Sequence, residues 1–531
     1  MHVVGVSGTG KSYFLEHMIR QDIENGAGVC VIDPHGELYQ NLVNWLSEQE
    51  IERFRTIHLI NPSDTNWSLA FNPLAAGDSD PTVRVGAMVN ACIKVWGNEG
   101  LEKTPRLAKC LRLVFYALAA NKLSIAEAKT FTSIDNKHKE ARSRLVNQLP
   151  DLAMREEWRS LLALGDREYA AQFESTDSRL IPFATAPIVR TMMGQTEHVI
   201  DFRKCMEENA IVLVNLANRD VFEEESARVL GSMILSDLFF SAKRRDFAEA
   251  KENPFYCYVD ECPRFLTADV IRALDETRKF GLHYVLAHQR LQQLRDLGDD
   301  MYDAVMAGAQ SKVVFKVDED DTAETLARLL YRKELDLQEP KEIMNKPIVV
   351  GQVPVWMHSE STTESESLSE STSVNEAESS SSSYDDEGVE VGSSEAANSS
   401  TSSTSSYSHS SSQTRGRSQA FQNIYEDRPT QLFTIEEQIH KGIVAIRSLP
   451  KRTAIAYLAD SGKPFRFSTT DIDTYEAPEV LLKDFVEEVN KENPTATLSI
   501  DARRNIDLRF QQVVDNIELF ESDSDDDFFD A

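Results

Sequence analysis

One short stretch limits the possible folds of this chain more than any other, namely Gly5-x4-Gly10-Lys11-Ser12 within HVVGVSGTGKSYFLEHMI. An apolar run precedes it, and an amphipathic helical pattern follows it. Glycine tolerates the left-handed turns through which backbone amides surround a phosphate, and a helix N-terminus adds its dipole. The spacing is that of a P-loop. It predicts a phosphate site between a strand and a helix; the alternative is a glycine-rich turn that binds no nucleotide.

Each residue type in this loop suits one task. The backbone amides of Gly8, Gly10 and Lys11 would surround the β-phosphate of a nucleotide. The Lys11 ammonium would neutralise β- and γ-oxygens, and the Ser12 hydroxyl would bind Mg²⁺. The predicted nucleotide-binding residues are Gly5, Gly8, Thr9, Gly10, Lys11, Ser12 and Tyr13.

Further apolar runs predict a doubly wound, mostly parallel sheet. The runs that we interpret as strands, beyond HVVGV at the start, are residues 28–33, 210–216, 255–260, 283–288 and 312–317. Between these runs the pattern is helical. Between about residues 80 and 185 the strand signal is absent, so we expect an all-α insertion at 81–185 between two parts of one α/β domain, 1–80 and 186–350.

The run FYCYVDEC ends in two acids, Asp260 and Glu261. A carboxylate at the end of a buried strand beside a P-loop is placed to complete the Mg²⁺ shell, which is the role we assign to Asp260. Glu261, one residue further, would polarise the attacking water. The alternative is an ordinary acidic strand end.

Two further candidates surround the next strand, in ETRKFGLHYVLAHQRLQQL. Gln289 ends that strand, where an amide can sense a γ-phosphate or orient water; it could also be an ordinary polar strand end. Arg278 precedes the strand and could reach the γ-phosphate of a neighbouring subunit, or simply be a solvated helix residue. His35, in VIDPHGEL, is expected to support a loop.

The chain changes character after about residue 350. Residues 359–425 are rich in serine and acids with almost no Leu, Ile or Phe, so we predict a disordered excursion. Order-like patterning returns at 426–475, where residues 443–449 and 452–459 are predicted strands that rejoin the sheet or form a hairpin. The rest, 476–531, is predicted to be helical and to end in an acidic tail, ESDSDDDFFDA.

Bulk composition excludes several classes of protein. The net charge of −31 argues against a generally basic nucleic-acid binder, so any DNA contact must come from a local basic patch. No run of about 18 apolar residues suggests a membrane span, and the start does not have the layout of a signal peptide. Six scattered cysteines without CxxC spacing indicate reduced, structural thiols.

Several of these motifs together resemble the conjugative coupling proteins (TraD/TraG-like) of type IV secretion, within the HerA/FtsK group of P-loop motors. The likeness covers most of residues 1–330 and, more weakly, 430–473. The stretches that carry it are HVVGVSGTGKS, CVIDPHGEL, FNPLA at 71–75, IVLVNLAN, YVDECPRFLT, ETRKFGLHYVLAHQRLQQL and SKVVFKVDEDDTAETLARLL.

This resemblance implies a RecA-like P-loop ATPase, with ATP and Mg²⁺ as cofactors and an all-α domain that faces the DNA-processing complex. It implies a homo-hexameric ring with ATP sites between subunits and DNA in the channel. Relaxosome or secretion-channel proteins would contact the all-α domain and the acidic tail. The residues that match the family's P-loop, Walker B, arginine-finger and sensor positions are Lys11, Ser12, Asp260, Glu261, Arg278 and Gln289.

We therefore expect an ATP-hydrolysing DNA-translocating motor, cytoplasmic or peripheral at the inner face of the cell membrane. Membrane-bound relatives carry transmembrane helices ahead of the P-loop, and none precedes Gly5, so we expect either no anchor or a shortened start. Two alternatives stay open. One is a protein-secretion ATPase of type IV systems, and the other is a nucleotide-gated binding protein with incidental turnover.

Overall fold

The structure is a computed structural model of the 531-residue chain. It forms two compact units, one of residues 1–334 with 440–531 and one of residues 335–439. The residues that it describes are 1–49, 51, 55–75, 81–96, 105–217, 223–267, 274, 276–332, 334–336, 340–343, 348–365, 378–384, 390–397, 410–426, 429–460, 462–473 and 475–515.

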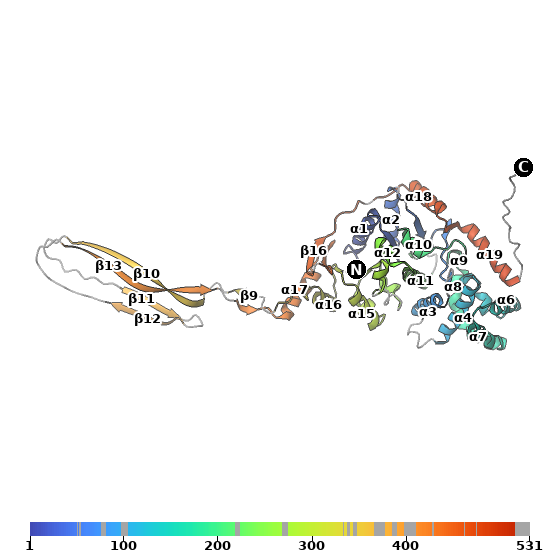
Figure 1. The fold of residues 1–531 in the computed structure, drawn as a ribbon, viewed down its shortest axis with the longest axis horizontal. Coiled ribbons are helices and arrows are strands. Elements are labelled where there is room, and N and C mark those ends of the chain that lie inside the picture. The colour runs from blue at the N-terminus through green and yellow to red at the C-terminus, as the bar shows by residue number, and fades with distance from the viewer. Residues whose placement is uncertain are drawn as a thin grey trace. The chain divides into compact units, whose positions relative to one another are not determined.

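A nine-stranded sheet, ordered β16-β15-β8-β1-β7-β6-β2-β5-β3, is the centre of the larger unit (Figure 1). Its strands are β1 (His2–Val4), β2 (Gly28–Asp33), β3 (Ile57–Ile60), β5 (Ile211–Asn215), β6 (Phe255–Val259), β7 (Leu282–His288), β8 (Lys312–Val314), β15 (Thr453–Tyr457) and β16 (Pro464–Ser468). The seven strands from β8 to β3 are parallel, and β15 pairs antiparallel with both β8 and β16. The mostly parallel sheet is thus confirmed, with β3 as an edge strand that the sequence reading missed.

The sheet is covered on both faces, which explains the nearly continuous apolar strands. Along β2, Val29 and Val31 belong to one buried cluster, whereas Cys30 and Ile32 belong to another. The first cluster includes residues of α1 (Lys11–Glu24), α2 (Glu37–Leu46) and α18 (Glu479–Glu492). The second includes residues of α3 (Pro81–Trp96), α10 (Phe202–Glu207) and α11 (Glu224–Ala242). All six cysteines are free and buried, as expected for structural thiols.

A helical region, residues 81–96 and 105–207, lies between β4 (Trp67–Leu69) and β5. Beyond α3 and α10 it contains α4 (Pro105–Ala120), α5 (Lys129–Thr132), α6 (Asn136–Asn147), α7 (Leu152–Leu162), α8 (Asp166–Thr185) and α9 (Pro187–Met193). Its core is aromatic: the rings of Trp158 and Phe173 stack at 5.8 Å, and Phe131 lies 5.5 Å from Trp158. The described part of the predicted insertion is therefore helical, and helices continue beyond residue 185.

Four further helices of the larger unit are α12 (Phe247–Glu252), α14 (Leu291–Arg295), α15 (Asp299–Gly308) and α16 (Asp320–Leu330). The first lies directly before β6, α14 and α15 follow β7, and α16 follows β8. Among the described residues, no helix combines the length and apolar character needed to cross a membrane.

The C-terminal part corrects one prediction. Residues 443–449, predicted as a strand, are the second half of α17 (Ile435–Arg447) and its C-terminal turn. The short apolar run is ambiguous, but Ile439 and Ile446 are buried seven residues apart, a helical spacing that the longer window contains. Residues 452–459 do contain a strand, β15, which both rejoins the sheet and forms a hairpin with β16.

The Ser-rich stretch also differs from its prediction. Within 359–425, where we predicted disorder, the structure describes paired strands. β10 (Ile348–Ser365) pairs antiparallel with β13 (Ser410–Glu426), β11 (Glu378–Tyr384) with β12 (Glu390–Ala397), and nearby β9 (Pro340–Ile343) with β14 (Pro429–Leu432). Antiparallel ladders are held by backbone groups, which serine provides as well as any apolar residue. Residues 366–377, 385–389 and 398–409, and the acidic tail, lie outside the described residues.

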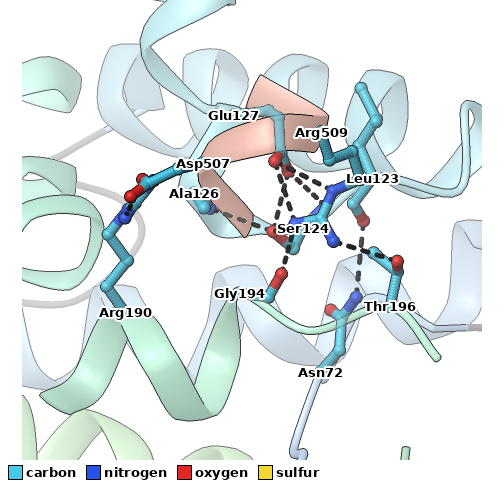
Figure 2. Close-up of polar contacts among 10 residues, drawn as sticks. All are labelled: Asn72, Leu123, Ser124, Ala126, Glu127, Arg190, Gly194, Thr196, Asp507 and Arg509. Carbon is cyan, nitrogen blue, oxygen red and sulfur yellow. Dashed lines mark hydrogen bonds and ion pairs between the residues drawn. The ribbon is translucent and has the colours of Figure 1, made fainter. Parts of the chain in front are cut away.

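The last described helix, α19 (Ser499–Asp515), lies along α9 and α6 (Figure 1). A short strand before it, β17 (Ala496–Leu498), pairs with β4. Figure 2 shows the polar contact that holds the helix: the Arg509 guanidinium donates to Glu127 Oε1 at 2.9 and 3.0 Å. It also donates to the Ser124 and Thr196 hydroxyls at 3.0 Å. Arg509 thus neutralises a carboxylate with 0% exposure.

We predict that Arg509→Ala releases α19 from the helical region. It leaves the buried Glu127 charge with only its Ser124 hydrogen bonds, and breaking a buried pair costs about 3 kcal/mol. Hydrogen exchange of the α19 amides should become faster by about two orders of magnitude, with the P-loop unchanged. Arg504→Ala, which removes an exposed charge from the same helix, is the matched control. Equal protection in the two variants would contradict this role.

Candidate functional site

A cavity of about 560 Å³ opens where the parallel strands end. The register of the sheet places the last residues of β1 and β7 side by side, since Val4 pairs with His288. It likewise pairs Ile32 of β2 with Val259 of β6. The residues that follow these strands therefore meet at one edge. The cavity is lined by Ser7, Gly8, Gly10, Lys11, Ser12, Tyr13, Asp33, His35, Glu37, Leu38, Asp260, Glu261, Gln289 and Lys451.

The glycines of the first loop are required for different reasons. Gly8 and Gly10 have φ of 75° and 108°, the left-handed region in which other residues are strained. A Cβ on Gly8 would meet no atom within 4 Å, so this part of the loop borders open space that a phosphate can enter. A Cβ on Gly5 would lie 2.5 Å from Phe315 Cβ, so Gly5 is fixed by the close approach of the chain after β8.

Lys11 is the first residue of α1, and its side chain folds back over the loop. Its Nζ donates to the Gly5 carbonyl at 2.6 Å and to the Val6 carbonyl at 3.4 Å. Burial lowers the pKa of Lys11, while the nearby Asp260 and Glu261 carboxylates oppose that shift. These carbonyls are weak partners for an ammonium, so an anionic ligand in the loop would compete well for it.

Three carboxylates crowd the opposite side of the cavity. Burial, together with the charges of Glu261 and Asp33, raises the pKa of Asp260 to about 6, although the Lys11 charge opposes this shift. Asp33 is engaged in a turn, where its carboxylate accepts hydrogen bonds from the backbone N–H groups of His35 and Tyr39 at 2.8 and 2.9 Å. Asp260 Oδ1 accepts a hydrogen bond from the backbone N–H of Glu261 at 3.0 Å, and Asp260 lines the cavity together with Lys11 and Ser12.

This arrangement fits a magnesium ion bound mainly by water and nucleotide. Among the described residues there is no cluster of three or more acidic, histidine or cysteine side chains able to hold a metal alone. Mg²⁺ in nucleotide sites takes only one or two protein ligands, and the Ser12 hydroxyl and Asp260 line the same cavity. A cation here would also relieve the repulsion that raises the pKa of Asp260.

Glu261 is held in place by two amides. Its backbone is left-handed, with φ of 45°, and it is buried. Gln289 Nε2 donates to Glu261 Oε1 at 2.6 Å, and Gln293 Nε2 donates to Oε2 at 3.5 Å. Gln293 also accepts from the backbone N–H groups of Gln289 and Arg290 at 3.2 and 3.0 Å, which ties α14 to the end of β7. The sequence reading missed Gln293, although its position four residues after Gln289 is a usable signal.

A pair of buried histidines lies beneath this region. His2 Nε2 and His288 Nε2 are 2.6 Å apart, and the rings stack with centroids at 4.8 Å. Burial lowers the pKa of His288 to about 4, so the pair is neutral near pH 7. The pair links β1 to the residue directly before Gln289.

The other predicted residues are placed differently. Thr9 Oγ1 donates to the Val6 carbonyl at 2.7 Å and so shapes the loop from within. Tyr13 O–H donates to the Ile472 carbonyl at 3.0 Å, and its ring stacks on the Arg452 guanidinium at 4.1 Å. The side chain of Arg278 lies outside the described residues.

Two family models match the chain. The model for the type IV secretion-system coupling protein DNA-binding domain matches residues 1–344. The model for the TraM recognition site of TraD and TraG matches residues 254–437. Among curated proteins, no match was found.

Solved structures resemble the fold over most of the chain. The bacterial conjugative coupling protein TrwBdeltaN70, in an unbound monoclinic form, is 16% identical over 90% of this chain and 86% of its own, with a TM-score of 0.50. The plasmid coupling protein TrwB in complex with the non-hydrolysable ATP analogue ADPNP is 16% identical over 90% of this chain and 87% of its own, also with a TM-score of 0.50. These likenesses confirm the predicted fold class.

We predict that Asp260→Asn stabilises the protein without Mg²⁺. The pKa of Asp260 in the folded protein, about 6, lies above its ordinary value of 3.8, so the ionised side chain destabilises the fold. The free energy of unfolding therefore falls as the pH rises from 3.8 to about 6. The variant should match the wild type at about pH 3, below both pKa values, and exceed it by roughly 3 kcal/mol above pH 6, because each pKa unit of the shift is worth about 1.4 kcal/mol. Denaturant unfolding in EDTA measures this difference; Asp303→Asn, at an exposed site, is the control. A variant less stable at pH 7.5 would contradict the prediction.

Proposed function

Because the chain belongs to the family of the type IV secretion-system coupling protein DNA-binding domain, we propose that it is an ATP-hydrolysing motor that moves DNA during conjugative transfer. One observation supports this proposal most strongly: the P-loop faces Asp260 and a Glu261 carboxylate that two amides orient across one cavity. A site that only held a nucleotide would not need an oriented carboxylate next to the metal-binding acid.

Each side chain has one task in the proposed reaction. The amides of the Gly8–Lys11 loop bind the β-phosphate, and the Lys11 ammonium leaves the Gly5 carbonyl to neutralise phosphate oxygens. Ser12 and Asp260 would hold Mg²⁺, which would neutralise negative charge on the phosphate oxygens. Glu261, held by Gln289, accepts a hydrogen bond from the attacking water and points it at the γ-phosphorus.

We propose that the active assembly is a homo-hexameric ring around DNA. Arg278 of a neighbouring subunit would complete the proposed ATP site as an arginine finger. Support comes from the family, whose matched region is described as DNA-binding, and from the resemblance to a coupling protein described in complex with an ATP analogue. Since the chain carries a net charge of −31, DNA must meet a local basic surface in the ring.

We also propose a contact with proteins of the DNA-processing complex, through the helical region and the acidic tail. The second matched family, described as a TraM recognition site, supports a protein partner, although the match falls on residues 254–437. Such a partner would place the motor at the cytoplasmic face of the cell membrane.

Two other functions remain as alternatives to test. If the chain is a protein-secretion ATPase, a pulldown with it should recover channel or pilus subunits, and the protein should not retain DNA. A nucleotide-gated binding protein would bind ATP tightly and hydrolyse almost none, even with DNA present. The oriented Glu261 carboxylate counts against the second alternative.

We predict ATPase activity that DNA stimulates and that Lys11→Ala or Glu261→Gln abolishes. Lys11→Ala removes the phosphate-neutralising cation, whereas Glu261→Gln keeps the shape of the side chain and removes its ability to accept a proton. Each change should reduce kcat by at least about 100-fold. Steady-state phosphate release with and without DNA measures both effects. Equal hydrolysis with and without nucleic acid would remove the support for a DNA motor.

We further predict that Gln293→Ala lowers kcat about threefold to tenfold and leaves KM for ATP nearly unchanged. The change removes the second amide on Glu261 and the contacts that fix the Gln289 backbone, so water is oriented less well, while the P-loop is untouched. Gln292→Ala is the matched control, because Gln292 bonds the exposed Asp296 on the same helix. A raised KM with unchanged kcat would contradict this positioning role.

A further inference from the structure

A turn from the far C-terminal part of the chain lies directly on the P-loop. The backbone N–H of Arg452 donates to the Thr9 carbonyl at 2.8 Å. A Cβ on Gly10 would lie only 3.2 Å from Arg452 Cα, so the two backbones are in contact. Arg452 itself has a left-handed φ of 64°, and its carbonyl accepts from the Thr469 N–H at 2.8 Å. The position of this turn is therefore fixed on both sides.

The direction of β15 explains why the turn reaches the site. All strands from β8 to β3 end at the edge where the cavity opens, but β15 runs antiparallel to β8. Its first residues, and not its last, consequently lie at that edge. Lys451, directly before Arg452, is exposed and lines the same cavity as the P-loop, Asp260 and Glu261.

The other cations at this edge already have partners. Lys11 is bonded to the Gly5 carbonyl, and Arg452 forms an ion pair with Asp471 and stacks on Tyr13. Lys451, in contrast, makes no hydrogen bond or ion pair with any residue in the part of the chain that the structure describes. It faces a cavity that also contains four carboxylate side chains, Asp33, Glu37, Asp260 and Glu261.

The order of the sheet indicates which end of a nucleotide Lys451 would meet. Asp260 and Gln289 follow β6 and β7, on one side of β1, whereas β8 and β15 lie on its other side. The γ-phosphate of a bound nucleotide must point towards Asp260 and Glu261. A cation that approaches the loop at Thr9 and Gly10 from the β15 side therefore meets the α- and β-phosphates.

We propose that Lys451 binds the α- and β-phosphates of the nucleotide held by the P-loop of the same chain. This inference rests on the proposed nucleotide site and adds a contact to it from the C-terminal part of the chain. Because the α- and β-phosphates are present in both ATP and ADP, Lys451 contributes equally to the binding of substrate and product. It strengthens nucleotide binding without acting in the chemical step.

The test compares Lys451→Ala, Lys451→Arg and the full-length wild type by isothermal titration calorimetry with Mg-ADP and with a Mg-bound non-hydrolysable ATP analogue. Loss of one solvent-exposed charge contact should weaken both ligands by about fivefold. Lys451→Arg should restore most of the affinity. Lys491→Ala, which removes an exposed charge from α18, is the matched control and should bind as the wild type does. Thermal unfolding of the ligand-free variants checks that each is folded.

Each result has one meaning. If Lys451→Ala binds both nucleotides more weakly and to the same extent, the proposal is supported. A raised KM for ATP with an unchanged kcat in this variant also supports it. Unchanged affinity for both nucleotides overturns it. If Lys451→Ala loses affinity for the ATP analogue alone, the proposal is also overturned, because the contact would then be to the γ-phosphate. If the wild type binds neither nucleotide, the proposed function itself fails, and this outcome differs from the others.

Discussion

The pairing of β1 between β7 and β8 is the constraint on which the site depends. β1 is only three residues long, and Val3 and Val4 are fully buried between parallel neighbours. Because β1 is paired on both sides, the loop that follows it leaves the sheet at a fixed point. Phe315, after β8, approaches Gly5 so closely that only glycine fits there. These two contacts hold the start of the loop whose backbone amides we propose to bind phosphate.

The acids around this loop are arranged at a cost in stability. Asp260 is buried beside two other carboxylates, and its pKa rises because its charged form is disfavoured. Glu261 adopts a left-handed backbone that a non-glycine residue rarely adopts. A bound cation would relieve the repulsion at Asp260. The strain therefore lies where the proposed chemistry takes place, and the apolar strands beneath supply the stability that offsets it.

The C-terminal part of the chain connects this site to the helical region. Near the P-loop, the turn at Arg452 and the backbone at Ile472 contact Thr9 and Tyr13. Further on, β17 pairs with β4, and Arg509 fixes α19 over the helical region (Figure 2). One continuous segment thus contacts both the candidate nucleotide site and the domain that we propose to face partner proteins.

The sequence by itself determined the P-loop, the acidic pair after β6 and the mostly parallel sheet, since each is recorded in a local pattern of glycines, charges or apolar runs. It also selected Gln289, which the structure brings to Glu261. It did not determine the partner amide of Gln293 or the place of Lys451 at the cavity. Those were decided by tertiary structure, because they depend on residues distant in the chain: the antiparallel direction of β15 brings Lys451 to a loop more than 400 positions earlier.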